Sequence, residues 1–259
     1  MLRSESTGSL GAVLFAGFCY AVTLVGLVTF IGFVSGLGSP IDVNTGPRWS
    51  WLTALLANVG LVIAWGIQHS VMARARFKRW WTQVIPPHTE RAFYCLASGA
   101  TLFAVCALWI PMDGVLWEIE GPTAIGLRVA QAMGWVVLLA ASFEIDHFDL
   151  FGLAQPWRAW RGLPTPEVPF QQRVLYRFVR HPIQLGVLIG VWVTPIMTVG
   201  HLVFALLMSL YIQVGLYFEE RALVREYGDV YRDYMLRVPR LIPGWRPLPN
   251  FVRPLTAQS

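Results

Sequence analysis

The chain has 259 residues, of which 55% are hydrophobic and only 14% are charged, with a formal net charge of +5. A soluble domain carries about 25% charged residues, and the mean hydropathy here is +0.52. This composition excludes a disordered chain, a disulfide scaffold and a nucleic-acid module. The three Cys residues lie in apolar segments without metal-ligand spacing, which favours small buried hydrophobes.

Four apolar segments are long enough to cross a bilayer, which takes roughly 20 residues each. They are 10–37, 51–73, 93–111 and 124–145, and the first is too long to be the core of a cleaved signal peptide. A fifth apolar block, 183–218, is too long for one spanning helix and is interrupted by Pro195 and Gly200. It therefore predicts a tight hairpin of two short spans, 183–197 and 200–218.

The predicted fold is an all-α polytopic membrane bundle of six spans, or of five if the hairpin enters the bilayer only partly. We expect an N-terminal region of transmembrane helices over 1–150 and a C-terminal region over 151–259. The connector 154–172 contains several prolines, and the proline-rich tail from Gly244 onward is expected to be extended.

The distribution of charge predicts the orientation. With six spans, both termini and the loops 74–92 and 146–182 share one side, which holds 18 of the 20 Lys and Arg residues. The positive-inside rule makes that side cytoplasmic, and the asymmetry explains the basic pI without a nucleic-acid partner. The segment 74–87 mixes cations with Trp80 and Trp81, which suits an anchor on anionic lipid or an ordinary cytoplasmic loop equally well.

Ionisable residues of the spans gather near the predicted cytoplasmic face, where such groups suggest function. They are His69 in the second span, Glu144, Asp146, His147 and Asp149 at the end of the fourth, His181 at the fifth, and Glu219 and Glu220 at the end of the sixth. Each also has an ordinary explanation as a packed histidine, a helix cap or a partner for loop arginines. No HExxH pattern, Rossmann glycine fingerprint or P-loop occurs, so no metal site is predicted.

The C-terminal residues resemble a known signature. The segments LYRFVRHPIQLG (175–186) and FEERALVREYGDVYRDYMLRVPRLIP (218–243), separated by a hairpin, are similar to the isoprenylcysteine carboxyl methyltransferase superfamily. The first block is carried by Arg180, His181, Pro182 and Gly186. The second is carried by Glu219, Glu220, Leu223, Tyr227, Gly228, Tyr231, Tyr234, Arg240 and Pro243.

The segments WGIQHSVMARARFKRWW, SFEIDHFDLFGLAQPW and TPIMTVGHLVFA resemble the bacterial methanethiol S-methyltransferases over nearly the whole chain. The chain departs from the prenyl-protein enzymes at Gln184, where those usually have Tyr. The resemblance implies a multi-pass protein of the bacterial inner membrane with both termini cytoplasmic. It also implies S-adenosylmethionine (SAM) as methyl donor and the conversion of methanethiol to dimethyl sulfide.

What the resemblance implies for the donor site is a set of nine residues: Arg180, His181, Pro182, Gln184, Gly186, Glu219, Glu220, Tyr231 and Tyr234. Arg180 or His181 would bind the donor's carboxylate, Glu219 its ribose, and Glu220, Tyr231 or aromatic faces its sulfonium. A thiol acceptor needs a base or a cation near sulfur, because the thiolate is the nucleophile. The candidates are Asp149 or Asp146 acting with His147 or His69, with Tyr211 positioning the sulfur.

Two alternatives stay open at this point: an enzyme of the same fold acting on a prenylated thiol or carboxylate, and a non-enzymatic accessory protein that binds haem through His69 and His147. The expected partners are a small volatile thiol and the lipid bilayer, with no nucleic acid and no obligate protein partner.

Overall fold

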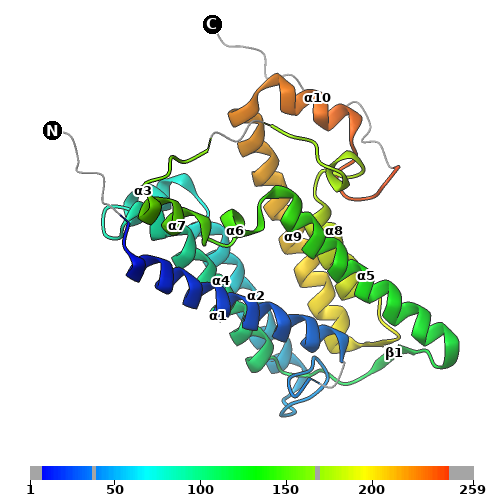
Figure 1. Ribbon diagram of the computed structural model, residues 1–259. Coiled ribbons are helices and arrows are strands. Elements are labelled where there is room, and N and C mark those ends of the chain that lie inside the picture. Colours follow the sequence, from blue (N-terminus) through cyan, green and yellow to red (C-terminus); the bar gives the residue numbers. More distant parts are fainter. Residues whose placement is uncertain (1–7, 37–38, 167–169, 245–259) are drawn as a thin grey trace, which may run out of the picture.

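The computed structural model describes residues 8–36, 39–166 and 170–244, and helices dominate it (Figure 1). Within that part of the chain, five helices are long and apolar enough to cross a membrane: α1 (Leu10–Ser35), α2 (Trp51–Met72), α4 (Glu90–Leu108), α5 (Gly121–Ile145) and α9 (Val199–Tyr227). The shorter elements are α3 (Ala75–Trp81), η1 (Pro87–Thr89), α6 (His147–Leu150), α7 (Ala154–Arg161), η2 (Leu175–Arg177), α8 (Pro182–Trp192) and α10 (Asp229–Arg237). The strands β1 (Val115–Glu118) and β2 (Ile196–Thr198) pair antiparallel. The all-α polytopic membrane fold is therefore confirmed.

Local sequence accounts for where the long helices begin and end. The Ser9 side chain accepts the backbone N–H of Ala12 at the start of α1, and the Thr198 hydroxyl caps α9 by accepting the N–H of His201, both at 3.1 Å. Helix α1 ends at Gly36 with φ +62°, a conformation that glycine adopts without strain. Helix α5 ends instead at Asp146, the one non-glycine residue with positive φ in the described chain.

The predicted hairpin differs from the observed one. Helix α8 has only 11 residues, a length of about 16 Å against a hydrocarbon core of about 30 Å. Residues 193–195 then lead into β2 without regular structure, because Pro195 cannot enter a regular helix. The second arm starts as predicted but continues to Tyr227, so α9 is a 29-residue helix rather than a span ending at 218.

Two pairs of glycines let neighbouring helices approach closely. A Cβ on Gly26 of α1 would lie 2.4 Å from the carbonyl oxygen of Gly99 of α4. A Cβ on Gly186 of α8 would lie 2.5 Å from the carbonyl oxygen of Gly134 of α5. Close backbone contact through small residues is how helices pack in lipid, where lipid tails weaken any hydrophobic drive between helices.

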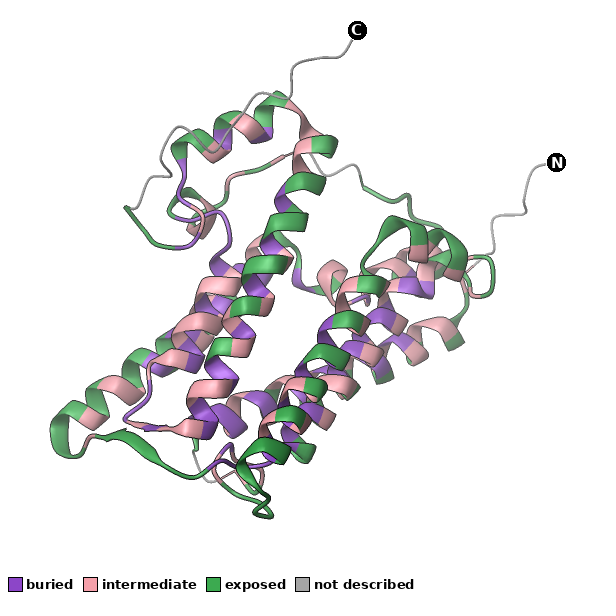
Figure 2. Ribbon diagram, turned by 180° about the vertical axis from the view of Figure 1, so that it is seen from behind, coloured by how far each residue is buried: buried purple, intermediate pink, exposed green. Residues whose placement is uncertain are grey.

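The buried core lies where these helices meet (Figure 2). Phe33, Trp65, Trp109, Val191 and Phe204 belong to one buried cluster that joins α1, α2, α8 and α9. Residues of both predicted regions, 1–150 and 151–259, therefore share the main core. The predicted functional division between them stays a prediction.

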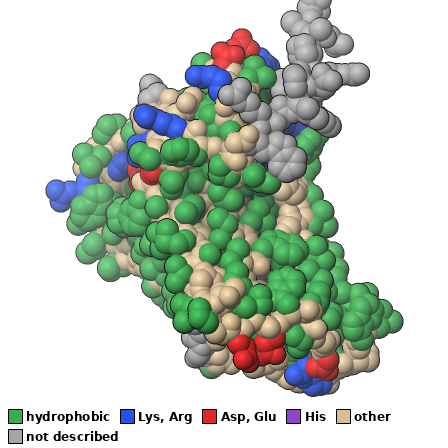
Figure 3. Space-filling view, turned by 90° about the vertical axis from the view of Figure 1, so that its right-hand side faces the viewer, with side chains coloured by type: hydrophobic (Ala, Val, Ile, Leu, Met, Phe, Trp, Pro, Cys, Tyr) green, Lys and Arg blue, Asp and Glu red, His purple; other side chains and the backbone are tan. Residues whose placement is uncertain are grey.

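Hydrophobic side chains cover much of the face of the molecule drawn in Figure 3. Exposed side chains such as Leu14, Leu56, Val136 and Leu210 face outward from α1, α2, α5 and α9, as expected for helices in contact with lipid. The first described turn of α1 lies at the same end of the bundle as α3, α7 and α10, and β1 lies at the other end (Figure 1). The predicted extended tail, 245–259, and Arg3 lie outside the described residues.

Candidate functional site

A cavity of about 220 Å³ lies at the end of the bundle that carries α10. Its walls come from the end of α5, the segment before α8, the first turn of α8, the second half of α9, and α10. The lining residues are Glu144, Ile145, Phe170, Gln171, Arg173, Tyr176, Arg180, His181, Ile183, Gln184, Glu219, Leu223, Tyr227, Tyr231 and Tyr234. Carboxylates, cations and phenols thus meet in one space beside apolar side chains.

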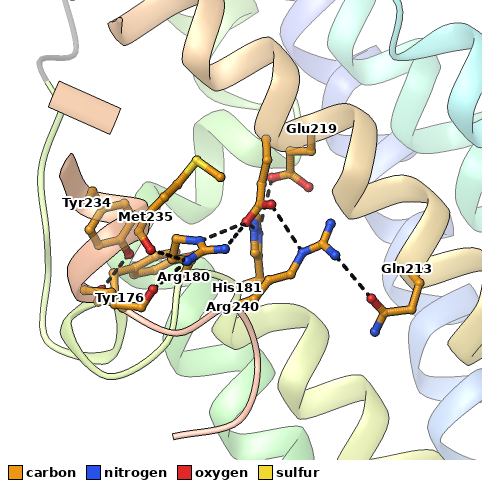
Figure 4. Close-up of polar contacts among 10 residues, drawn as sticks. Tyr176, Arg180, His181, Gln213, Glu219, Tyr234, Met235 and Arg240 are labelled. Carbon is orange, nitrogen blue, oxygen red and sulfur yellow. Dashed lines mark hydrogen bonds and ion pairs between the residues drawn. The ribbon is translucent and has the colours of Figure 1, made fainter. Parts of the chain in front are cut away.

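An ionic cluster centred on Glu220 forms the base of this cavity. Arg180 Nε and Nη2 both lie 2.8 Å from Glu220 Oε1, and His181 Nε2 lies 3.1 Å from the same oxygen. Arg240 Nε lies 3.3 Å from the other oxygen, Oε2. The neighbouring Glu219 is half-exposed on the cavity wall, with Oε1 3.9 Å from His181 Nδ1 (Figure 4).

The same cluster fastens the segment after α10 to the start of α8. Arg180 Nη1 donates to the carbonyl oxygens of Met235 and Val238 at 3.0 and 2.5 Å. The backbone N–H groups of Arg180 and His181 donate to the carbonyl oxygens of Pro239 and Arg240. The first block of the signature and its terminal block are therefore one structural unit.

Aromatic side chains form the outer wall. Phe170 packs against Tyr227, Tyr231 and Tyr234, with ring centroids 5.1 to 5.7 Å apart. The Tyr234 hydroxyl donates to the carbonyl oxygen of Tyr176 at 2.6 Å. Burial raises the pKa of Tyr234 to about 12 and also raises the pKa values of Tyr176 and Tyr231. These phenols are neutral at physiological pH, so the wall offers ring faces and hydroxyls rather than charge.

Most of the nine predicted donor-site residues come together here. Arg180, His181, Gln184, Glu219, Tyr231 and Tyr234 line the cavity, and Glu220 lies beneath it. Pro182 and Gly186 are not among the lining residues. Pro182 is buried in the first turn of α8, and Gly186 forms the close contact with α5. Their place in the signature has a packing explanation, although all nine assignments stay predictions.

His69 and Tyr211 form a second polar cluster, between α2, α4 and α9. The Tyr94 hydroxyl lies 2.8 Å from His69 Nε2, and the Ser98 hydroxyl lies 3.1 Å from His69 Nδ1. Tyr211 packs its ring against Trp65 and His69, and its hydroxyl lies 3.4 Å from that of Ser70. Both candidate residues are thus brought together inside the bundle, but neither lines the cavity.

The three remaining catalytic candidates have partners elsewhere. His147 Nδ1 lies 2.8 Å from the Ser142 hydroxyl, which donates to the Leu139 carbonyl, so Nδ1 carries the proton and Nε2 accepts from Tyr20. The Asp146 side chain caps α6 by accepting the N–H of Asp149. Asp149 is ion-paired with Arg158 of α7. The structure does not bring these side chains to the cavity wall, and their catalytic roles stay predictions.

Several wall residues had no predicted role. Glu144 was grouped with the polar end of the fourth span, but its carboxylate faces the cavity and accepts the backbone N–H of Leu175 at 2.9 Å. Phe170 belongs to the predicted connector, 154–172, and Arg173 follows that connector directly. Tyr176 lies within the first signature block, four residues before Arg180. This closeness in sequence could have indicated that Tyr176 belongs to the site.

The residues present fit a charged, nucleoside-containing methyl donor better than a metal. Among the described residues, no three His, Cys, Asp or Glu side chains are placed to hold a metal ion. The cavity instead combines ring faces, two carboxylates and two arginines, Arg173 and Arg180. These groups suit a base, ribose hydroxyls, an ammonium and a carboxylate. A membrane bundle with this cavity at one end is consistent with a polytopic methyltransferase.

Comparison with known proteins makes the assignment specific. The chain is 42% identical over 238 residues to the methanethiol S-methyltransferase of Pseudomonas sp. (strain GM41(2012)), covering 92% of each protein. It is 42% identical over 232 residues to that of Mycobacterium tuberculosis, covering 89% of this chain and 95% of the relative. Nurim of Bos taurus is more distant, at 29% identity over 209 residues, 74% of this chain and 78% of that protein.

No family model matches the chain, and no solved structure matches it. The fold and these relatives define an integral-membrane enzyme of the isoprenylcysteine carboxyl methyltransferase-like superfamily. The chain belongs to the methanethiol S-methyltransferase family. It is a multi-pass membrane protein and a methyltransferase.

Proposed function

We propose that this protein uses SAM to methylate methanethiol and releases dimethyl sulfide. The observation that carries the proposal is the cavity beside Glu220, where Arg173, His181, Glu144, Glu219 and a wall of neutral phenols converge. The relatives that match nearly the whole chain are named for methanethiol, and this substrate is carried over from them.

The cavity residues have complementary roles toward the donor. Phe170 and the tyrosines offer ring faces for adenine and for the sulfonium charge, and Glu219 and Glu144 offer acceptors for ribose hydroxyls or the ammonium. Arg180 already binds Glu220 and two carbonyl groups. His181 also binds Glu220, so Arg173 is the better partner for the donor's carboxylate. When bound, the donor supplies an electrophilic methyl carbon.

The chain's own part in the reaction is to hold the thiol sulfur in line and remove its proton. The sulfur passes its proton to a base, its lone pair forms the new carbon–sulfur bond, and the bond to the sulfonium sulfur breaks with its electron pair. His69 is the candidate base, because its ring nitrogens lie within hydrogen-bond distance of the hydroxyls of Tyr94 and Ser98, which can relay a proton. An enclosed site also excludes water and fixes the approach of sulfur.

The proposed setting is the bacterial inner membrane, with the α10 end of the bundle in the cytoplasm. Helices α3 and α7, whose sequences contain basic residues, lie at that end (Figure 1), in agreement with the positive-inside rule. This orientation places the cavity where water-soluble SAM is available, while methanethiol and dimethyl sulfide move through lipid. Both termini are then cytoplasmic, and no obligate protein partner is required.

The experiment that tests this function is an assay of purified protein with SAM, read as dimethyl sulfide in the headspace. We expect product with methanethiol and no methylation of a prenylated cysteine. Methylation of the prenylated cysteine alone would overturn the proposal in favour of the prenyl-type alternative. The haem alternative gains no geometric support, because His69 and His147 bind hydroxyl groups in different helix interfaces.

A further inference from the structure

One face of α9 connects the donor cavity to the buried His69 cluster. Tyr211, Gly215 and Glu219 follow one another at intervals of four residues, so they lie along the same side of the helix, about 6 Å apart in rise. Tyr211 points toward α2, with its ring 4.7 Å from that of Trp65. Glu219 lines the cavity. Gly215 therefore lies between these two sites, on the same side of α9.

The space in front of Gly215 is open. A Cβ built on this residue meets no atom within 4 Å, although the residue is half-buried. The neighbouring Leu210 and Val214 are exposed side chains of the outward face. Gly66, the glycine opposite Tyr211 on α2, differs, because its Cβ would lie 3.0 Å from the Tyr211 ring.

Packing does not explain a glycine at position 215. Inside a helix, glycine costs roughly 0.5–1 kcal/mol relative to alanine, and here nothing stands close enough to exclude a side chain. Close approach of helices explains Gly26, Gly99, Gly134 and Gly186, but it does not apply to Gly215. The absent side chain at position 215 leaves a space between two polar sites, and such a space suits a small ligand.

A contact between the segment just after α2 and helix α9 lies beside this space. The Arg74 guanidinium, just after α2, lies 4.4 Å from the centroid of the Phe218 ring on α9. Phe218 is the residue beside Glu219, so the contact lies on the same turn as the donor cavity. The open space therefore has Tyr211 at one end, Glu219 at the other and the Arg74–Phe218 pair at its side.

We propose that the thiol acceptor binds against Gly215, between Glu219 of the donor cavity and the Tyr211–His69 cluster, and that the missing side chain limits acceptors to short alkyl thiols. This assignment rests on the proposed function. The bare Cα leaves room for an apolar methyl group, and the polar groups at the two ends are available to the sulfur and its proton. Adding side-chain volume at 215 should then compete with the acceptor and not with the donor.

The test compares Gly215→Leu and Gly215→Ala with Gly126→Leu. Gly126 is also a helical glycine with no atom within 4 Å of a built Cβ, but it lies near the start of α5, at the far end of the bundle. For Gly215→Leu we expect the kcat/KM for methanethiol to fall at least tenfold, with the Kd of S-adenosylhomocysteine within threefold of wild type. Gly126→Leu should change neither value by more than threefold.

Gly215→Ala supplies a readout of acceptor size that loss of folding would not produce. One methylene in an apolar pocket is worth about 10- to 200-fold in discrimination. We therefore expect the alanine variant to lose at least tenfold in the ratio of ethanethiol to methanethiol turnover, with the Kd of S-adenosylhomocysteine within threefold of wild type.

Wild-type methanethiol turnover by Gly215→Leu would overturn the assignment, and so would a tenfold loss of donor affinity in that variant. An unchanged ethanethiol ratio in Gly215→Ala would also contradict it. Failure of the proposed function is distinct: the wild-type protein would then bind S-adenosylhomocysteine and yield no dimethyl sulfide, which overturns both proposals.

Discussion

Arg180 binds a single oxygen of Glu220 through two of its nitrogens, with Nε and Nη2 each 2.8 Å from Oε1. The Arg180 side chain is only 4% exposed and that of Glu220 only 11%, so this pair is almost entirely removed from solvent. His181 and Arg240 complete the surroundings of the same carboxylate. Removing the negative charge would leave the buried Arg180 guanidinium without its counter-charge.

Glu220→Gln is therefore expected to destabilise the fold by about 3 kcal/mol, in the range measured when one partner of a buried ion pair is removed. Glu219→Gln is the matched control, because the adjacent carboxylate is half-exposed. We expect the Glu219 variant to keep wild-type thermal stability and to bind S-adenosylhomocysteine more weakly, by about tenfold. Thermal unfolding in detergent and calorimetric binding separate the two effects. The reverse pattern would contradict the structural role of Glu220.

Substitutions at His69 and at Asp149 are expected to have different effects on kcat. His69 belongs to the buried cluster with the Tyr94 hydroxyl, whereas Asp149 is ion-paired with Arg158. We expect His69→Phe to lower kcat for methanethiol by at least 100-fold, the usual range for loss of a general base, with donor affinity unchanged. Asp149→Asn should retain kcat within threefold. A large loss of kcat in Asp149→Asn, with donor binding intact, would instead support a catalytic carboxylate in α6.

Gly186 belongs to the signature, yet its role in the structure is to let α8 approach α5. The Cβ of an alanine would lie 2.5 Å from the Gly134 carbonyl oxygen and 2.7 Å from the Leu138 nitrogen. Gly186→Ala should therefore lower stability by about 1 to 3 kcal/mol, the usual cost of overpacking. Measured well below its unfolding temperature, the variant should bind S-adenosylhomocysteine like wild type. Weak binding by a protein of wild-type stability would make Gly186 a donor contact.

The raised pKa of Tyr234 predicts that the protein loses stability at high pH. Burial raises its pKa from the ordinary value of 10 to about 12, so unfolding allows the phenol to ionise at a lower pH. Its stabilising effect is complete below pH 10 and is lost as the pH rises toward 12. Tyr234→Phe should lower stability by about 1 kcal/mol at pH 8, through the lost hydrogen bond to Tyr176. Across pH 9–12 its unfolding temperature should fall less steeply than that of wild type, and parallel curves would contradict this.

The apolar segments predicted the long helices well, because burial in lipid imposes one hydrophobic length on each span. The bounds of α1 and α2 follow those of the predicted segments closely. The end of α8 at Trp192, five residues before the predicted end of that span, was not predicted. Nor was the β1–β2 pair, which joins residues about 80 positions apart in the sequence. The Ile119 N–H, for example, donates to the carbonyl oxygen of Pro195.

Some residues of the candidate site were likewise predicted from the sequence, and others were not. Arg180, His181 and Glu219 belong to the two signature blocks, so the resemblance to the superfamily predicted that they share a site. The pattern at the end of α5 grouped Glu144 with Asp146, His147 and Asp149, although in the structure only Glu144 reaches the cavity wall. The left-handed conformation of Asp146 redirects the chain at that point, and sequence periodicity cannot reveal such a turn.

The most direct measurement of the central claim is a structure of the protein with S-adenosylhomocysteine bound. We expect this ligand to lie between α8, α9 and α10, in contact with Glu219, Tyr176 and Tyr231, with its sulfur directed toward Gly215. Density for the ligand at any other place in the bundle would contradict the proposed donor site.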